Sequence, residues 1–226
     1  MINNFTILGE RHSGTNLCEK NIMRRFVLPI TYDFGNKHFF KREFIGPKEN
    51  TSNTLFFCCI RNPYDWLLSM FSEPHHCGFC HQGNLIKFLH EEWFSIGPLL
   101  GPEILEDRNM YSGERYKNIF ELRSVKAEFL HRIIPLITMN NFMMKYEDVY
   151  ADEPKIIKNI SIQYKLQIMR DSPVELRPHK KHYKHMTKEA FLCINNNVDW
   201  ELENSIGYYP FIDFDQFVNF YKNKIG

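Results

Sequence analysis

The stretch from Phe5 to Phe26 places the tightest constraint on the fold of this chain. An apolar run at 5–8 leads into a loop with glycines at positions 9 and 14, and a helical pattern follows over 15–26. Such a loop points its backbone N–H groups at one spot, and the dipole of the following helix adds positive potential there. The pattern predicts a phosphate-binding loop. The alternative is a tight strand–helix turn without a ligand.

Two positions of this loop differ from those of nucleoside triphosphatases. Thr15 stands where those enzymes have a lysine, and Asn16 stands where they have a magnesium-binding serine or threonine. The differences argue against a triphosphate–magnesium site. Arg11 and His12 supply side-chain donors instead, and Thr15 and Asn16 add hydroxyl and amide groups at the start of the helix.

The composition is that of a globular chain with a large aromatic core. The sequence has 226 residues, which suits one domain over 1–226, and 20 Phe and 11 Tyr are enough to fill that core. A net charge of +1 does not indicate attraction to nucleic acid or to an acidic membrane, so anion binding has to be local. Trp66, Trp93 and Trp200 are expected in the core rather than stacked on a ligand.

The six cysteines do not form a regularly spaced framework, which favours a reducing compartment. Neither a signal peptide nor an apolar segment of about 20 residues is evident in the sequence. We therefore expect a soluble, cytoplasmic protein with no membrane span.

Strands and helices are expected to alternate along the chain. Apolar runs predict buried strands of a parallel sheet at 5–8, 55–60 and 141–145, and a further strand is predicted at 30–34. Residues 95–117 are predicted to be irregular. Helices are predicted at 15–26, 63–71, 85–94, 119–133, from 154 onward, 187–194, 199–206 and 213–223. The alternation favours an α/β fold with a central parallel sheet.

A second anion site is predicted after the apolar run at 55–60. Arg61 ends that run, and Ser69 follows two turns into the next helix. Open parallel sheets bind ligands at the carboxyl ends of their strands, so Arg61 and the loop at 9–14 are expected at the same edge. An arginine fork with a hydroxyl suits a phosphate dianion. Taken alone, Arg61 is equally well explained as a capping residue or a surface ion pair.

Four stretches in this order resemble the sulfotransferases that use 3′-phosphoadenosine 5′-phosphosulfate (PAPS). They are RHSGTN at 11–16, IRNPYDWLLSMF at 60–71, FMMKYEDVYADEP at 142–154 and VDWELENSIGYYP at 198–210. The resemblance implies a three-layer α/β/α sandwich of the P-loop-like sulfotransferase fold. It also implies PAPS as co-substrate and adenosine 3′,5′-bisphosphate as product, which accounts for a loop without lysine or a metal-binding hydroxyl.

The resemblance assigns roles to several residues. Arg61 and Ser69 correspond to the family's 3′-phosphate pair. His12 aligns with the basic residue that contacts the leaving group, and Arg11 precedes it. The family's late basic loop has no clean match, but Lys180 and Lys181 stand in the basic stretch at its place. The 5′-phosphosulfate loop corresponds to six consecutive residues, Arg11, His12, Ser13, Gly14, Thr15 and Asn16.

The histidines of residues 72–83 are candidates for the general base that takes the acceptor proton. His76 is the favoured candidate, and Glu10, Asp65 and Glu73 are rivals. Histidines of such a loop are also commonly solvated and without a role. The same segment contains Cys77-x2-Cys80, which is a weak zinc pattern without a second pair, and no metal is predicted.

Two cations on the predicted helix 119–133, Arg123 and Lys126, lie three residues apart. They could border an acceptor pocket, but the favoured interpretation is that they form a solvated face or pair with Glu121 and Glu128.

Three functions remain open at this point: a PAPS-dependent sulfotransferase, a P-loop kinase or hydrolase with an altered loop, and a non-catalytic nucleotide-binding module. The sulfotransferase is favoured because the loop is poorly equipped for magnesium and triphosphate. Its acceptor is left open among a carbohydrate, a protein side chain and a small alcohol, since acceptor pockets vary on a shared scaffold.

Overall fold

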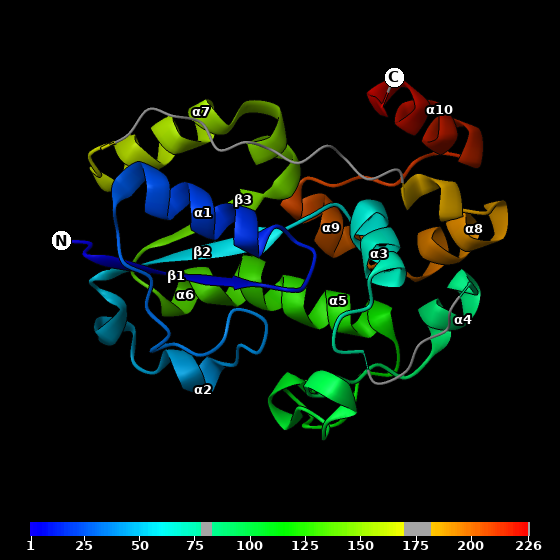
Figure 1. Ribbon diagram of the computed structural model, residues 1–226, viewed down its shortest axis with the longest axis horizontal. Coiled ribbons are helices and arrows are strands. Elements are labelled where there is room, and N and C mark those ends of the chain that lie inside the picture. Colours follow the sequence, from blue (N-terminus) through cyan, green and yellow to red (C-terminus); the bar gives the residue numbers. More distant parts are fainter. Residues whose placement is uncertain (78–82, 170–181, 226) are drawn as a thin grey trace. The chain divides into compact units, whose positions relative to one another are not determined.

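The computed structural model describes residues 1–77, 83–169 and 182–225. Its contacts divide the chain into two compact units, each built from two segments. The first unit comprises Met1–Arg61 and Lys126–Leu176, and the second comprises Asn62–Val125 and Arg177–Gly226. Helix α5 (Ile119–Glu128) contains the point of division. Each unit is described by itself, and Figure 1 gives the element labels.

The first unit is built on a parallel sheet of three strands in the order β1-β2-β3. They are β1 (Asn4–Gly9), β2 (Thr54–Ile60) and β3 (Asn141–Lys145). Leu8 lies opposite Cys58, and Cys59 lies opposite Met144. Every residue of β2 is buried, as expected of a central strand whose two faces are both covered.

One face of this sheet is covered by α1 (Thr15–Phe26) and α7 (Tyr146–Tyr164), which Figure 1 shows on the same side of the strands. Between helices and strands lies a buried cluster. It comprises Phe5, Ile7, Cys18, Ile22, Phe26, Leu55, Phe57, Cys59, Met144, Val149, Ile157 and Ile160. The Arg25 guanidinium joins the two helices through the Glu153 carboxylate, with N–O distances of 2.9 and 2.6 Å. Both side chains are buried, so the pair fixes α7 against α1.

The other face of the sheet is covered by the segment after α1 and by the residues that follow α5. The Phe34 ring lies 4.8 Å from that of Phe56 on β2, and the Phe40 ring stacks on that of Phe129. Phe129 begins a π-helical turn, Phe129–Ile133, that joins α5 to α6 (Ile134–Ile137). The segment after α1 also contains α2 (Arg42–Ile45) and a 3-10 turn (Lys48–Thr51).

The second unit is helical in its described residues and packs around aromatic side chains. Its helices are α3 (Pro63–Ser72), α4 (Leu85–His90), α8 (Lys188–Asn197), α9 (Trp200–Ile206) and α10 (Phe214–Ile225), with 3-10 turns at Pro98–Leu100, Leu105–Asp107 and His182–His185. The side chains of Asn62, Asn84, Thr187 and Asp199 cap the first four, each accepting from a backbone N–H in the first turn. Gly207, with φ of 93°, ends α9.

Tyr64 is central to the core of the second unit. Its ring contacts those of Phe191, Phe211 and Phe217, and its hydroxyl donates to Asn195 at 2.5 Å and accepts from the Phe211 N–H at 3.1 Å. Burial raises the pKa of Tyr64 to about 12, so the hydroxyl keeps its proton and both bonds. The abundance of phenylalanine and tyrosine is thus largely accounted for by packing.

The α/β class and the parallel sheet confirm the prediction from sequence, as do the bounds of the helix at 15–26 and the strand at 141–145. The strand predicted at 30–34 is wrong, because only Ile30 bridges to Phe5 before the chain turns at Gly35. The helix predicted at 85–94 ends at His90. The strand at 141–145 is mostly half-buried rather than buried. The single domain over 1–226 stays a prediction.

Within the described ranges, every helix is too short or too polar to cross a lipid bilayer.

Candidate functional site

The candidate site lies at the carboxyl edge of the sheet in the first unit. Because the three strands are parallel, the residues that follow them meet at this edge. The loop at 9–14 follows β1, Arg61 follows β2 and Tyr146 follows β3. All three belong to the first unit.

Two positions of this loop, Gly9 and Gly14, have no room for a side chain. Gly14 caps α1 with φ of 92°, and a Cβ atom there would lie 2.8 Å from the Tyr146 ring. A Cβ atom on Gly9 would lie 2.7 Å from the carbonyl oxygen of Cys59 on β2. His12 also has a positive φ, of 61°. The loop is therefore fixed by close backbone packing, which holds its N–H groups at the start of α1 in one orientation.

Arg61 lies against this loop. Its Nη1 donates to the carbonyl oxygen of His12 at 3.3 Å, and its guanidinium carbon lies 4.6 Å from the centre of the Tyr146 ring. The side chain is buried. The structure thus brings together two of the predicted features, the glycine loop and the arginine that ends the next strand.

The remaining predicted residues belong to the second unit or lie outside the described residues. Ser69 is buried on α3 of the second unit, and its backbone oxygen accepts from the Glu73 N–H. His76 belongs to the same unit and has φ of 59°, and its Nδ1 lies 3.1 Å from the carbonyl oxygen of Ile96. Lys180 and Lys181 lie outside the described residues, as does Cys80 of the zinc pattern.

Within the loop, the polar side chains that the sequence predicts to bind phosphate make internal contacts. The Ser13 hydroxyl donates to the carbonyl oxygen of Glu10 at 2.5 Å. The Asn16 amide oxygen accepts from Lys37 Nζ at 2.6 Å, and this lysine also lies 3.5 Å from Glu19. Thr15 is the buried first residue of α1. These contacts shape the loop and add a lysine, Lys37, at its rim.

Beneath the loop lies a cluster of buried charges centred on Glu10. Its Oε1 accepts from the backbone N–H and from Nη1 of Arg11, at 2.7 and 2.8 Å, and its Oε2 accepts from Lys126 Nζ at 2.5 Å. Burial alone would raise the pKa of Glu10, but Lys126 and Arg11 outweigh it and lower that pKa to about 2. Glu10 is therefore a carboxylate at neutral pH and is not a proton donor or acceptor there.

His38 lies beside this cluster and contacts the backbone of the loop. Its Nδ1 lies 2.7 Å from the carbonyl oxygen of Gly9, and since a carbonyl only accepts, Nδ1 carries the proton. Burial lowers the pKa of His38 to about 4 despite the opposing influence of Glu10. The ring is therefore neutral at pH 7, with its proton on Nδ1 and a lone pair on Nε2, and the lowered pKa makes it a weaker base than a solvated histidine.

Sequence reasoning missed His38 and Tyr146 as site residues, and for Lys126 it considered a place at a pocket but favoured a solvated or paired position on its own helix. That preference is wrong, because Lys126 is buried against Glu10. Arg123 is buried too, and pairs with Glu203 within the second unit. The local sequence could not predict the contact of Lys126, since its partner is 116 residues away, whereas a histidine after the predicted phosphate loop was a signal that could have been used.

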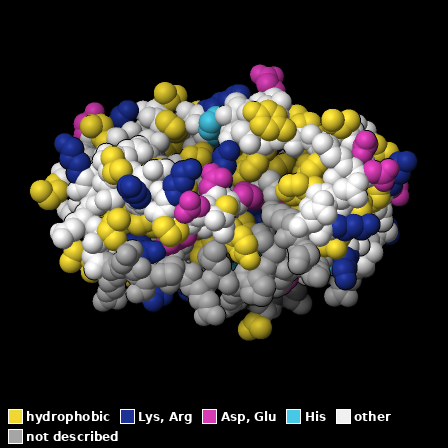
Figure 2. All heavy atoms as spheres, turned by 90° about the horizontal axis from the view of Figure 1, so that it is seen from above, with side chains coloured by type: hydrophobic (Ala, Val, Ile, Leu, Met, Phe, Trp, Pro, Cys, Tyr) yellow, Lys and Arg dark blue, Asp and Glu magenta, His cyan; other side chains and the backbone are white. Residues whose placement is uncertain are grey.

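The surface in Figure 2 is not dominated by one sign of charge. Over the face seen in Figure 2, basic and acidic side chains are interspersed among apolar ones, in keeping with the net charge of +1 for the whole chain. An anion would thus be attracted by particular groups rather than by the field of the entire molecule.

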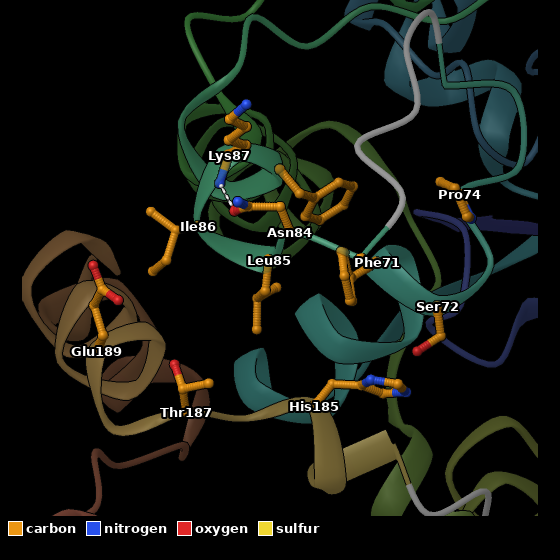
Figure 3. Close-up of a pocket in the computed structure, with 12 residues that line it drawn as sticks. Phe71, Ser72, Pro74, Asn84, Leu85, Ile86, Lys87, His185, Thr187 and Glu189 are labelled. Carbon is orange, nitrogen blue, oxygen red and sulfur yellow. Dashed lines mark hydrogen bonds between the residues drawn. The ribbon is translucent and has the colours of Figure 1, made fainter.

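The second unit has a cavity of about 890 Å³, whose lining differs from the residues at the glycine loop. Leu85, Phe71 and Phe88 give it an apolar lining, and the helix caps Asn84 and Thr187 add polar groups. Figure 3 shows Leu85 and Lys87 extending in opposite directions from α4. Its charged residues, which include Lys87, are exposed, so the cavity lacks the buried cations that mark the loop.

Comparisons of the chain with protein-family models, with curated proteins and with solved structures gave no match.

Proposed function

We propose that this protein is a sulfotransferase that takes a sulfonate group from PAPS and transfers it to a hydroxyl or amine acceptor. The proposal includes the three-layer sulfotransferase fold for the α/β architecture and assigns the glycine loop to the 5′-phosphosulfate. It assigns Arg61 to the 3′-phosphate, with Ser69 as its expected partner in the bound complex.

The observation that carries the proposal is the position of Arg61. Its guanidinium is buried against a glycine loop that has no lysine at position 15 and no magnesium-binding hydroxyl at position 16. A γ-phosphate with its metal would find neither of the usual ligands in this loop. A nucleotide with two separate anionic groups, and with no need of magnesium, matches a loop of N–H donors beside a fixed arginine.

With a hydroxyl acceptor, the reaction makes one S–O bond and breaks another, and with an amine it makes an S–N bond instead. The acceptor oxygen attacks the sulfur in line, the bond from sulfur to the bridging phosphate oxygen breaks, and negative charge collects on the 5′-phosphate of the departing adenosine 3′,5′-bisphosphate. The N–H groups of the loop and the side chains of His12 and Thr15 are the donors assigned to that charge. Fixed donors of this kind are usually the largest contribution to catalysis.

The acceptor proton needs a base, and the proposal assigns it to His38. This residue lies in the same unit as the loop, has a fixed tautomer and is neutral at pH 7, so that Nε2 accepts the proton and a hydrogen ion is finally released to solvent. His76, the candidate from sequence, belongs to the second unit and stays a prediction.

Calorimetry with adenosine 3′,5′-bisphosphate tests the proposal. Binding is expected to be equal with and without magnesium, and ATP with magnesium is expected to bind far more weakly. Arg61→Ala should weaken binding of the bisphosphate by at least tenfold, in line with the loss of a charge-assisted contact. Arg42→Ala, at an exposed arginine of the same unit, is the matched control.

A preference for ATP with magnesium, or equal affinities of the Arg61→Ala and Arg42→Ala variants for the bisphosphate, would show that the nucleotide and the site are wrongly assigned.

A further inference from the structure

We propose that the ammonium group of Lys37 stands at the place where nucleoside triphosphatases have a magnesium ion, and that it contacts the anion held by the glycine loop. The inference rests on the proposed function in that it takes this loop to bind a phosphate-type anion. It makes Lys37 a binding residue for that anion and gives a reason for binding without magnesium.

Lys37 spans the loop from its first residue to the start of the following helix. The Gly9 N–H donates to the Lys37 carbonyl oxygen at 2.8 Å, so the backbone of Lys37 is fixed at the end of β1. The side chain reaches Asn16, the second residue of α1, with 2.6 Å between Nζ and the amide oxygen. The ammonium is therefore held beside the first turn of α1, whose N–H groups are the proposed anion donors.

The partners of the ammonium indicate which cation it replaces. Asn16 stands at the position whose serine or threonine binds magnesium in nucleoside triphosphatases, and its amide oxygen binds an ammonium instead. Lys37 Nζ also lies 3.5 Å from a carboxylate oxygen of Glu19, three residues further along α1. Magnesium commonly takes one or two carboxylate oxygens together with phosphate oxygens of a ligand. The oxygen atoms around Nζ are thus of the kinds that would suit a metal ion.

The N-terminal end of α1 is an unfavourable place for a cation without an anionic ligand. This end of a helix carries partial positive charge, which favours a carboxylate and opposes an ammonium. The first turn of α1 has no acidic residue, and Lys37 brings a positive charge to it. Glu19 offsets part of the cost. An anion in the loop would be attracted by both the helix and the ammonium, which supports a role of Lys37 in binding rather than in folding alone.

Lys37 is accessible to a ligand. Its side chain is 26% exposed and that of Glu19 is 28% exposed, and Asn16 is exposed as well. A lysine ammonium has three N–H donors, so contacts with Asn16 and Glu19 leave a donor for an anion. An anion can therefore reach the ammonium without a rearrangement of the loop.

A lysine that only ties its segment to α1 would behave differently, and the difference provides the test. Loss of such a lysine would change the response of anion binding to magnesium no more than loss of any other surface lysine. If the ammonium stands in place of a metal, Lys37→Met frees the oxygen atoms of Asn16 and Glu19, and a magnesium ion can take its place. Magnesium should then compensate for the missing charge.

Calorimetry of the full chain with inorganic pyrophosphate, at low salt and with or without magnesium chloride, makes this comparison. Without magnesium, Lys37→Met should bind pyrophosphate about fivefold more weakly than the wild type. With magnesium, the difference should fall to about twofold or less. Magnesium also binds pyrophosphate in solution, so variant and wild type are compared in the same buffer, where this equilibrium affects both equally.

Three further variants complete the experiment, and melting temperatures show that each is folded. Lys48→Met, at an exposed lysine of the same unit, removes the same charge elsewhere and should bind as the wild type does in both buffers. The double variant Lys37→Met with Glu19→Gln lacks the carboxylate for the metal, so magnesium should compensate less. Lys37→Gln is also neutral and takes the place of Lys37→Met should that variant fail to fold.

The response to magnesium decides the outcome. A difference between Lys37→Met and the wild type that magnesium leaves unchanged would overturn the inference. Equal binding of these two proteins without magnesium, or no binding of pyrophosphate to the wild type, would overturn it as well. The expected pattern without binding of adenosine 3′,5′-bisphosphate would leave the inference standing while refuting the proposed function, and binding of the bisphosphate without the pattern would refute the inference alone.

Discussion

Two groups of buried charges in the described part of the first unit are composed differently. Both carboxylate oxygens of Glu153 accept from one guanidinium, that of Arg25. The carboxylate of Glu10 instead divides its oxygens between two cations, Arg11 and Lys126. The first carboxylate joins two helices, while the second joins the loop after β1 to α5. The comparison teaches that a buried carboxylate with one cation can fasten two elements together, whereas one shared by two cations fixes several groups around a loop.

The largest expected effect falls on the pair of Arg25 and Glu153. Glu153→Gln removes a buried carboxylate charge from beside the Arg25 guanidinium, and the free energy of unfolding in urea should fall by about 3–5 kcal/mol. Pyrophosphate affinity, measured where the variant is still folded, should remain within about twofold of the wild type. A large loss of affinity in this variant would remove the distinction between the two clusters.

A smaller effect is expected from the pH dependence of His38. Its pKa is about 4 in the folded protein and 6.5 in a model peptide, so the unfolded chain binds a proton that the folded chain does not. The resulting stability is fully present above about pH 6.5 and is lost as the pH falls toward 4. Between pH 7 and 4.5 the wild type should lose about 2 kcal/mol more than His38→Asn, which keeps a donor for the Gly9 carbonyl.

Urea unfolding at the two pH values measures this difference between wild type and variant. Equal losses in both proteins would mean that His38 is not held neutral beside the loop, and its assignment as the base would lose its support.

How far the site could be predicted from sequence depends on whether a feature is local. The helix at 15–26 and the strand at 141–145 were predicted with their bounds. Their apolar residues indicate the element, and glycine, asparagine or aspartate near their ends indicates where it begins or ends. Asp152 accepts from the Lys155 N–H and so caps the second part of α7, where a helix from 154 onward is predicted. The glycine loop and Arg61 follow from the rule that ligands bind at the carboxyl ends of parallel strands.

Non-local features were beyond such reasoning. Residues 30–34 have the composition of a strand, but only Ile30 pairs, because the chain then turns away to place Phe34 on Phe56. The cluster at the loop depends on a contact between Lys126 and Glu10, which are 116 residues apart in the sequence. The sequence around each residue does not predict this contact. Tertiary structure alone determines which charges are shared.

Gly14→Ala probes the backbone of the loop rather than its charges. Alanine would require a positive φ and would place a Cβ atom 2.8 Å from the Tyr146 ring, so the ring or the loop has to move. Gly113→Ala is the control, because Gly113 also has a positive φ but has open space around it. Gly14→Ala should destabilise the protein by about 1 kcal/mol more than the control in urea unfolding, and it alone should weaken pyrophosphate binding. Equal behaviour of the two variants would contradict a loop fixed by Tyr146.

The smallest effect on stability is expected at Lys37, the second lysine of the loop. It contacts Asn16 and Glu19 as Lys126 contacts Glu10, but its side chain is 26% exposed whereas that of Lys126 is 4% exposed. Lys37→Met should change the free energy of unfolding by less than about 1 kcal/mol, because a solvated ion pair is weak and screened. Its influence on pyrophosphate affinity should disappear between about 0.05 and 0.5 M salt, while that of the buried Arg61 should persist, since salt screens exposed charges more than buried ones. If Lys37→Met and Arg61→Ala both ceased to affect the affinity over that range, the guanidinium of Arg61 would be as solvated as the ammonium of Lys37, and burial beside the loop would not strengthen anion binding.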